Sequence, residues 1–544
     1  MRQPAWRRCV AALLLLSPLS RAAASASADE TVDVCVVGAG PSGIGAALAL
    51  ADKGKTVALL ERDDRAGGQT KPEYRDPATG FRTHQGAIVL TPPDYPTVLK
   101  YASRVGIGIE LYANDPIGSS FYLANGNSEP LVITAPDSPN MARLRGLAGD
   151  FRGFVNTMRR FSALYKKLKP VLFARGGMPA TLRAAPELAM NMDAWLEAHE
   201  LSLLSPLAAQ LLMQTGYGHE YETSAASALQ YLSPYTLLSG LAGSGIDTSK
   251  LITAADRMGF NHSLFMFTDD VGFAEVMQRS AGLLPAGTLR LKVAITAVQR
   301  PAADAAPGSP VFVTYTQAGR GGSTTLRCGA LVNTVAQALP NLGFLGLDET
   351  EASLFRSVIW ARYFTVAMKV TPKLREGMYV LPLPRDGGVY RRVRTSRLRG
   401  DRFENRPALP LLSALVDPSP YRGEVTALFS VNHGAANRPA GVPYSADQGL
   451  MVAYSYTDVP MTPAEIAAKA VSMVNGTRRR AEALQVFEFI YYPRVSESDL
   501  KAGWMERADR LQGRRSTYHA GGLFTFWDVE GAFRSGFDLV DRFF

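Results

Sequence analysis

The fold of this chain is decided by residues 33–70, DVCVVGAGPSGIGAALALADKGKTVALLERDDRAGGQT. Residues 34–37 form a short apolar run that stops at a glycine, which is typical of a strand buried on both faces in a parallel sheet. Three glycines, Gly38, Gly40 and Gly43, then form the pattern G-x-G-x-x-G. The first allows a tight turn, the second lets backbone approach a pyrophosphate, and the third lets the next helix pack against its strand.

A helix is expected over residues 41–53, which are rich in alanine and leucine and carry Pro41 in the first turn, where a missing N–H costs little. Its N-terminus directs unpaired N–H groups and the positive end of the helix dipole at a phosphate. A second apolar strand, 56–60, ends at Glu61, whose carboxylate is placed to accept ribose hydroxyls. These features together predict a nucleotide-binding βαβ unit, with a βαβ unit that binds no nucleotide as the alternative.

The residues after this unit distinguish between nucleotide cofactors. Gly67 and Gly68 resemble the second phosphate-contacting turn of the flavin amine-oxidase superfamily, which NAD dehydrogenases do not usually carry. The resemblance implies FAD. In that superfamily a turn of small residues passes close to the isoalloxazine ring, and residues 83–88, THQGAI, occupy the corresponding place here. An ordinary strand end is the alternative for this turn.

Two further segments are similar to the superfamily. Residues 288–334 resemble its antiparallel excursion, in which backbone at Val293 would pair with the adenine edge. Near the chain end, a short strand at 516–519 and a glycine turn precede a helix that begins at Asp528. A helix whose positive end faces the flavin N1/C2=O edge stabilises the negative charge that appears on reduction.

The C-terminal stretch carries a more specific resemblance. Its segments YYPRVS, KAGW, LQGRR and DLVDRFF, and Gly216-Tyr217-Gly218-His219, resemble FAD-dependent polyunsaturated fatty acid isomerases. The segments GAGPSG, KGK and DPATG resemble cyclopiazonate-dehydrogenase-like flavoenzymes. Three departures stand out: Gly522 replaces an acid of the terminal turn, residues 108–128 contain no arginine, and Thr215 replaces the phenylalanine before the G-Y-G-H run. In the isomerases, an arginine in this region and that phenylalanine help hold the fatty acid. The residues of this chain therefore do not support binding of a fatty carboxylate by resemblance.

Motifs and resemblance together define the expected site. Tyr217 and His219 are the candidate catalytic residues, as polar groups that face the pocket, and His84 is a weaker candidate. No histidine or cysteine spacing indicates a metal site. The residues expected to contact FAD are Gly38, Gly40, Pro41, Ser42, Gly43, Glu61, Arg62, Gly67, Gly68, Gln69, Gln85, Gly86, Ala87, Val293, Gly521, Gly522, Asp528 and Val529.

The expected fold class is α/β, with a Rossmann-type FAD-binding domain whose parallel sheet has an antiparallel excursion. Because 544 residues exceed one ordinary core, more than one domain is expected. The FAD-binding domain is predicted from residues 31–92, 286–345 and 487–544. A mixed α+β substrate domain, formed by 93–285 and 346–486, is interleaved with it.

The first 28 residues resemble a signal peptide, with a positive n-region, an apolar run and an Ala-Ser-Ala cleavage site. The apolar run is too short for a membrane anchor, and no transmembrane span is expected. A twin-arginine signal at Arg7 and Arg8 is an alternative form of export. We therefore expect a secreted, periplasmic or secretory-pathway protein. Removing residues 1–28, which hold four arginines, lowers the net charge from +9 to +5, and this small surplus does not indicate a nucleic-acid partner.

Two other features of the sequence, the cysteines and a basic amphipathic stretch, have structural interpretations. Cys35 and Cys328 lie in predicted buried strands, where cysteine behaves as a small hydrophobe, and no disulfide is expected. Residues 145–174 place apolar side chains at helical spacing among arginines and lysines. This pattern favours a domain helix with a solvated basic face, and contact with a membrane surface or a lipid is the alternative.

Three functions follow from these observations. The leading hypothesis is an exported FAD oxidoreductase that moves a hydride between a lipophilic small molecule and flavin N5. The second is a redox-neutral double-bond isomerase of polyunsaturated fatty acids, which returns the hydride to another carbon. The third is a binding protein of the same fold, similar to the prenyl-protein escort factors, although those lose the glycine set and ribose acid that are present here. The sequence does not indicate an oligomeric state.

Overall fold

The computed structural model describes most of the chain from residue 28 onward. The residues that it does not describe are 1–27, 72, 78–81, 88, 89, 91–93, 112–119, 123–130, 133–150, 206, 207, 209, 210, 213, 214, 219, 238–264, 269, 270, 307, 373–376, 381–421, 431–448, 458, 459, 477 and 478. His219, one of the two candidate catalytic residues, therefore lies outside the described residues, as does the predicted signal peptide up to residue 27.

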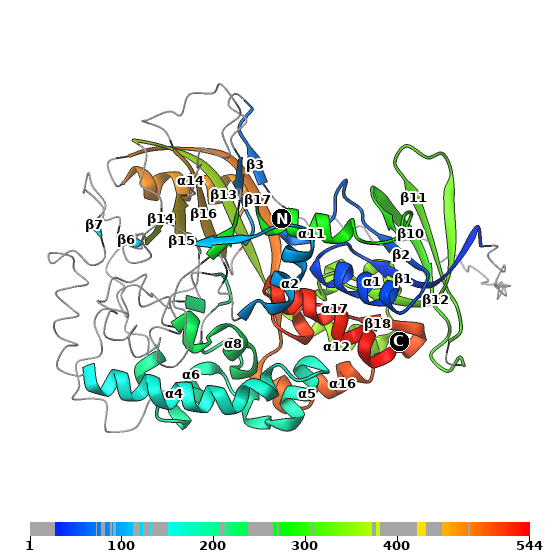
Figure 1. Cartoon of the computed structure of the whole chain (residues 1–544), viewed down its shortest axis with the longest axis horizontal. Coiled ribbons are helices and arrows are strands. Elements are labelled where there is room, and N and C mark those ends of the chain that lie inside the picture. Colours follow the sequence, from blue (N-terminus) through cyan, green and yellow to red (C-terminus); the bar gives the residue numbers. More distant parts are fainter. Residues whose placement is uncertain are drawn as a thin grey trace, which may run out of the picture.

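One seven-stranded sheet holds the glycine motif, and its strand order is β10-β11-β12-β1-β2-β9, with β18 beside β12 (Figure 1). The parallel strands are β1 (Glu30–Val37), β2 (Val57–Leu60), β9 (Leu289–Arg290), β12 (Ser323–Asn333) and β18 (Thr517–His519). The antiparallel excursion consists of β10 (Val293–Gln299) and β11 (Val311–Gln317). The predicted parallel sheet with an antiparallel excursion is therefore confirmed.

Two helices from opposite ends of the chain cover one face of this sheet. Helix α1 (Pro41–Asp52) follows the glycine turn, and α17 (Val529–Phe543) packs along it. The two backbones approach closely at Gly45 and Gly536, where added Cβ atoms would overlap backbone atoms of the other helix. Helices α2 (Pro96–Arg104) and α11 (Phe273–Ala281) share the same apolar core. Glycines at this crossing therefore bring the first and last helices of the described chain together.

A second seven-stranded sheet lies at the other end of the molecule (Figure 1). Its order is β17 (Arg480–Arg494), β13 (Ile359–Thr371), β16 (Gly449–Thr457), β15 (Arg422–Ser430), β14 (Gly377–Val380), β6 (Ser120–Tyr122) and β7 (Leu131–Val132). All neighbours are antiparallel except β14 and β6. Alternate residues of β13, such as Phe364 and Val366, pack against Ile466 and Ala470 of α14 (Pro463–Asn475).

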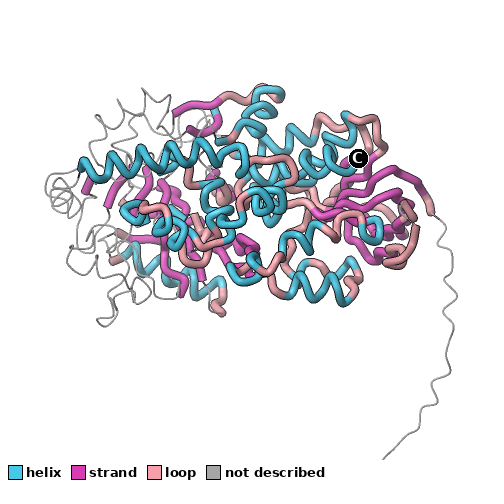
Figure 2. The backbone as a smooth tube through the Cα atoms, turned by 90° about the horizontal axis from the view of Figure 1, so that it is seen from below, coloured by secondary structure: helices cyan, strands magenta, loops and turns pink. Residues whose placement is uncertain are grey.

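A layer of helices joins the two sheets, and Figure 2 shows these helices spread between the two groups of strands. They include α4 (Phe151–Leu172), α5 (Gly177–Ala184), α6 (Met192–Ala198), α8 (Ala225–Tyr231), α12 (Glu349–Arg356), α15 (Glu497–Lys501) and α16 (Trp504–Asp509). A short two-stranded sheet is formed by β5 (Ile109–Leu111) and β8 (Phe265–Phe267). A hairpin of β3 (Glu73–Arg75) and β4 (Arg82–His84) follows the second glycine turn.

Helix α4 shows how the basic amphipathic stretch is used. Met158, Phe161, Tyr165 and Leu172 are all buried in the main hydrophobic core. Its apolar stripe is thus occupied by the protein's own side chains, as the domain-helix interpretation expects.

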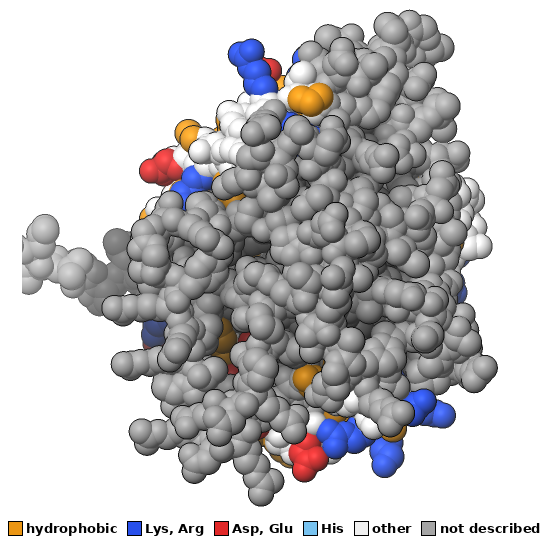
Figure 3. Space-filling view, turned by 90° about the vertical axis from the view of Figure 1, so that its left-hand side faces the viewer, with side chains coloured by type: hydrophobic (Ala, Val, Ile, Leu, Met, Phe, Trp, Pro, Cys, Tyr) orange, Lys and Arg blue, Asp and Glu red, His pale blue; other side chains and the backbone are white. Residues whose placement is uncertain are grey.

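At the lower edge of the face in Figure 3, positive and negative described side chains lie near one another. Within the described part of the chain, no helix combines the length and the apolar character that crossing a bilayer requires.

The expectation that the two strand cysteines stay unpaired is wrong. Cys35 of β1 and Cys328 of β12 form a disulfide with a Cα–Cα distance of 5.6 Å, and both residues are fully buried. The two positions lie 293 residues apart, so their proximity follows only from the adjacency of β1 and β12. Sequence spacing carries no information about which distant strands become neighbours.

The helix crossing yields the first prediction. In Gly536→Ala the new methyl group would overlap the Ser42 carbonyl oxygen and the Ala46 N–H, which are backbone atoms of α1 and cannot rotate away. We expect a loss of about 1–3 kcal/mol in the free energy of unfolding, as for other overpacked sites. Gly321→Ala is the control, because its Cβ would meet nothing within 4 Å. Urea denaturation of both variants measures the difference, and equal stability would contradict the packing argument.

Candidate active site

The first glycine turn is joined to the acid at the end of β2. The Gly38 N–H donates to the Leu60 carbonyl oxygen (2.9 Å), and the Ala39 N–H donates to Glu61 Oε2 (2.7 Å). Glu61 Oε1 accepts a second hydrogen bond, from the Asp63 N–H (3.0 Å). The carboxylate is only 6% exposed and is fixed beside the turn, with lone pairs left for the hydroxyls of a ribose.

Each glycine of this turn has a steric reason. A Cβ on Gly43 would overlap the Gly38 carbonyl oxygen, so that helix and strand pack backbone to backbone. Gly38 adopts a φ of +96°. Gly40 is the N-cap of α1 and provides no side-chain cap for the first N–H groups of the helix. These groups are therefore suited to an anion.

The second glycine pair packs directly onto the first turn. The Gly67 N–H donates to the Ala39 carbonyl oxygen (2.7 Å), and a Cβ on Gly68 would lie 2.8 Å from Gly40 Cα. No side chain separates the two turns at this point. The pair thus extends the cradle of backbone that begins at the first turn, as a diphosphate requires.

The turn predicted to face the flavin ring lies beside the second glycine pair. A Cβ on Gly86 would lie 3.0 Å from the Gln69 carbonyl oxygen, and Tyr454 donates its hydroxyl to the Gly86 carbonyl (3.0 Å). Gln85 is fully buried, and its Oε1 has no hydrogen-bond partner in the described part of the chain. A buried amide oxygen without a donor is costly. The position therefore fits a ligand that brings an N–H or O–H group.

The C-terminal turn completes the arrangement and explains a departure from the superfamily. A Cβ on Gly522 would lie 2.8 Å from Trp527 Cα and would collide with the indole ring. The indole N–H of Trp527 donates to Gln69 Oε1 (3.3 Å), and Gln69 Nε2 donates to the Ile490 carbonyl oxygen (2.8 Å). An acid at position 522 has no room, because Trp527 occupies that space.

Asp528 caps the helix that follows this turn. Its Oδ1 accepts a hydrogen bond from the Gly531 N–H (2.5 Å), and burial raises the pKa of the carboxyl to about 7. Two residues later, Glu530 accepts the N–H groups of Thr97 (3.0 Å) and Val98 (2.8 Å) at the start of α2. Burial thus raises the pKa of both acids, and that of Asp528 reaches the neutral range.

Tyr217 belongs to a cluster of buried aromatic side chains. Its ring lies 4.7 Å from that of Phe526 and 5.2 Å from that of Tyr492, and it is stacked on Tyr491 at 5.8 Å. Its hydroxyl donates to the Trp527 carbonyl oxygen (3.4 Å). Burial raises the pKa of Tyr217 well above the ordinary value, so this phenol stays neutral and acts as a donor.

The remaining predicted residues lie around these turns. The Val293 N–H donates to the Glu61 carbonyl oxygen (2.9 Å), so this N–H is already used beside the ribose acid. Arg62 is 87% exposed and lies near Asp63. Sequence reasoning missed Lys71, whose Nζ is 3.8 Å from Glu61 Oε1, and Trp527. Two sequence signals could have indicated these residues: a lysine ten positions after Glu61 and a tryptophan directly before Asp528.

Four features together define a flavoprotein of Rossmann type. They are the two glycine turns, the acid Glu61 at the end of β2, the unpaired oxygen of Gln85 and the capped terminal helix. More particularly, the chain belongs to the family described as flavin containing amine oxidoreductase, whose model matches residues 41–341. The predicted cofactor, FAD, and the predicted superfamily are thereby confirmed.

Similar proteins span nearly the whole chain. It is 24% identical over 538 residues to the FAD-dependent oxidoreductase dpasF of Apiospora sacchari, covering 94% of each chain. It is 23% identical to the FAD-dependent oxidoreductase oblC of Cochliobolus heterostrophus, covering 92% of this chain and 88% of that one. Among solved structures, the CLA-producing fatty acid isomerase from P. acnes has a TM-score of 0.61 at 20% identity, covering 94% and 99%. The chain is therefore an FAD-dependent enzyme of the flavin amine oxidoreductase family, and the escort alternative is set aside.

The ribose acid generates the second prediction. Glu61→Gln keeps the size of the side chain but replaces one acceptor with a donor beside the Ala39 and Asp63 N–H groups. We expect about 1.5–3 kcal/mol weaker FAD binding, which is roughly a 10- to 100-fold rise in Kd. Quenching of flavin fluorescence during titration of apoprotein measures it. Glu349→Gln, at an 83% exposed side chain on α12, is the control and should bind FAD normally; equal affinities would contradict the assignment.

Proposed function

We propose that this enzyme moves a hydride between a lipophilic small molecule and flavin N5. The observation that carries the proposal is the cluster of buried, uncharged aromatic side chains next to Trp527. Tyr217 contacts Phe526, Tyr231, Tyr491 and Tyr492, and the stack continues from Tyr491 to Tyr363 at 4.6 Å. Aromatic faces provide apolar surface, and their hydroxyl groups provide a few directed hydrogen bonds.

The electrostatics of the cluster favour a substrate that carries no charge at the reacting carbon. Burial raises the pKa of Tyr217 and Tyr363 well above the ordinary value and that of Tyr231 to about 12. These phenols therefore stay protonated at neutral pH. Bound FAD supplies the hydride-accepting atom. The residues of the chain position the substrate and exclude water, so that a C–H bond is held close to that atom.

The isomerase remains the alternative function. It is favoured by the likeness in fold to the fatty acid isomerase over 94% of this chain. The leading proposal is favoured by two relatives named FAD-dependent oxidoreductases that match over most of their length. Both reactions use the same cofactor and an apolar site. They differ in whether the hydride leaves the substrate permanently or returns to another of its carbons.

An anaerobic titration tests the proposal. Purified FAD-containing protein is mixed without oxygen with linoleate, linoleyl alcohol or linoleylamine, and absorbance is recorded across the visible and ultraviolet range. The proposal expects lasting bleaching of the flavin band with at least one of these apolar compounds. Diene absorbance without lasting bleaching would assign the isomerase instead. Neither change with any of the three would overturn both functions for this class of substrate.

Tyr217→Phe tests the predicted catalytic tyrosine in the same assay. The variant keeps the aromatic ring but loses the hydroxyl that donates to the Trp527 carbonyl oxygen. We expect the rate of the observed reaction to fall about tenfold or more with FAD content unchanged. Tyr165→Phe is the control, because Tyr165 is a buried phenol of α4 outside this cluster. A normal rate in Tyr217→Phe would remove this residue from the catalytic set.

We also propose that the protein is exported. The disulfide between Cys35 and Cys328 supports this proposal, because disulfides form and persist mainly in oxidising compartments. Both cysteines are fully buried, so the bond has to form before or during folding of the sheet. Expression with residues 1–28 should yield extracytoplasmic protein whose mature chain starts after them, and peptide mapping without reductant should recover the linked pair. Cytoplasmic protein with two free thiols would contradict export.

A further inference from the structure

Arg494 lies at the end of β17, next to the aromatic cluster, and its guanidinium group is incompletely paired. Its side chain is only 10% exposed. Nη2 donates to Glu222 Oε2 at 3.2 Å, whereas Nε and Nη1 are buried and form no hydrogen bond to any described residue. Leaving N–H donors of a buried cation unpaired is expensive. A protein retains such a group where a ligand supplies the missing acceptor.

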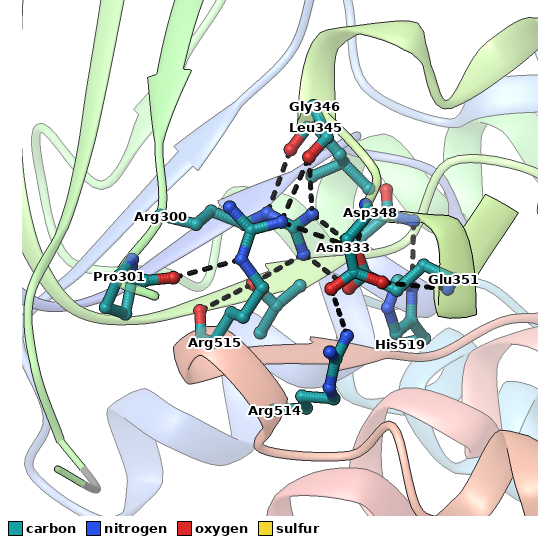
Figure 4. A network of polar contacts seen from close by, with 11 residues as sticks. Arg300, Pro301, Asn333, Leu345, Gly346, Asp348, Glu351, Arg514, Arg515 and His519 are labelled. Atoms are coloured by element: carbon teal, nitrogen blue, oxygen red, sulfur yellow. Dashed lines mark hydrogen bonds and ion pairs between the residues drawn. The ribbon is translucent and has the colours of Figure 1, made fainter. Parts of the chain in front are cut away.

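Arg300 shows how this chain satisfies an arginine that has a purely structural role (Figure 4). Its guanidinium donates to both carboxylate oxygens of Glu351 at 2.7 Å, to the carbonyl oxygens of Leu345 (2.8 Å) and Gly346 (3.1 Å), and to Thr517 Oγ1 (3.5 Å). All five N–H groups of Arg300 therefore have acceptors within the protein. Arg494 differs from Arg300 because two of its donor nitrogens, Nε and Nη1, lack acceptors in the described part of the chain.

The backbone and side chain of Tyr492 add two observations next to Arg494. Tyr492 has a φ of +47°, a left-handed conformation that is unusual for an aromatic residue. Its hydroxyl is buried beside Thr223 and Ser227 but has hydrogen-bonding geometry to neither of these nor to another described group. The Arg494 guanidinium lies over the ring at 5.9 Å. Strained backbone that holds unpaired polar groups together is characteristic of ligand sites.

The surroundings specify the charge of the ligand. Glu222 already neutralises part of the guanidinium, and its side chain is 35% exposed, which marks the solvent side of Arg494. Arg494 and Glu222 together are neutral, so Glu222 repels any bound anion, but it repels a monoanion only about half as strongly as a dianion. A carboxylate can still accept hydrogen bonds from Nε and Nη1, which Glu222 leaves unpaired. On the inner side, Tyr492 contacts Tyr217, and Tyr217 reaches the Trp527 carbonyl oxygen. Apolar rings therefore connect Arg494 with the segment next to the flavin.

We propose that Arg494 binds the carboxylate of a lipophilic acid whose apolar part extends along the aromatic cluster. This inference rests on the proposed function and names its substrate class as apolar monocarboxylic acids. The proposed cation lies on β17, whereas residues 108–128 contain no arginine.

Palmitate and methyl palmitate test the proposal as a matched pair. Palmitate is saturated and cannot be isomerised, and binding is measured without oxygen through the change in tyrosine and tryptophan fluorescence. An unchanged flavin band in the same samples shows that no hydride has been transferred. We expect wild-type protein to bind palmitate about 10- to 100-fold more tightly than the ester. Arg494→Gln should reduce this ratio to about one with little change for the ester, and Arg494→Lys should retain part of it.

Three further variants make the outcome decisive. Arg362→Gln, on neighbouring β13 where Arg362 pairs with Glu488 at 2.7 Å, should keep the full ratio. Glu222→Gln should raise the affinity for palmitate, because it removes the competing carboxylate from Arg494. Glu222→Gln combined with Arg494→Gln removes both charges and keeps the test valid if the single variant does not fold. Equal binding of acid and ester by wild type, or an unchanged ratio without Arg494, would overturn the proposal.

The two proposals fail separately. Acid-selective binding without flavin bleaching or diene formation would leave the Arg494 site intact and reject the proposed reaction. Flavin bleaching by linoleyl alcohol with no preference for acids would retain the oxidoreductase and reject the Arg494 site.

Discussion

The close approach of α1 and α17 is the constraint on which the rest of the structure depends. Gly45 and Gly536 allow the two helix backbones to meet without intervening side chains, although their helices lie at opposite ends of the chain. The strands that lead into them end level with one another, since Val37 is paired with Asn333, and Asn333 with His519. The first glycine turn and the terminal glycine turn therefore meet at one edge of the sheet. This contact fixes the helices that follow the two turns relative to each other.

The part of the site that follows from steric necessity could be predicted from the sequence. The Gly43 position and the Gly68 position each leave no room for a Cβ, and such requirements leave a readable pattern of glycines. Contacts between distant segments could not be predicted. The disulfide depends on which strands become neighbours, and the Trp527–Gln69 hydrogen bond joins residues 458 positions apart. The absence of an acid at Gly522 was visible, but its cause, the indole ring, required coordinates.

A buried network of ion pairs and hydrogen bonds stabilises the segment that leads into the terminal glycine turn. Arg300 and Glu351 form a fully buried ion pair, and Arg514 pairs with Asp348 at the start of the same helix, α12 (Figure 4). His519, one residue before the turn, lies 3.3 Å from the Asn333 amide through Nδ1, and burial lowers its pKa to about 4. This histidine therefore stays neutral, and its role is to connect β18 with β12. A buried pair that loses one member leaves an uncompensated charge, so the network favours a single orientation of the turn.

The ionisation of Asp528 at the start of α17 depends on two opposing effects. The N-terminus of α17 favours the carboxylate, by about 0.3–2 kcal/mol for such a position. Burial favours the neutral acid, and the rise of the pKa to about 7 shows that burial outweighs the helix. The phenols around it hold their protons, because burial raises their pKa values in the same direction. Near neutral pH the charge of this segment therefore depends on the ionisation of Asp528, and burial raises the pKa of Glu530 in the same direction.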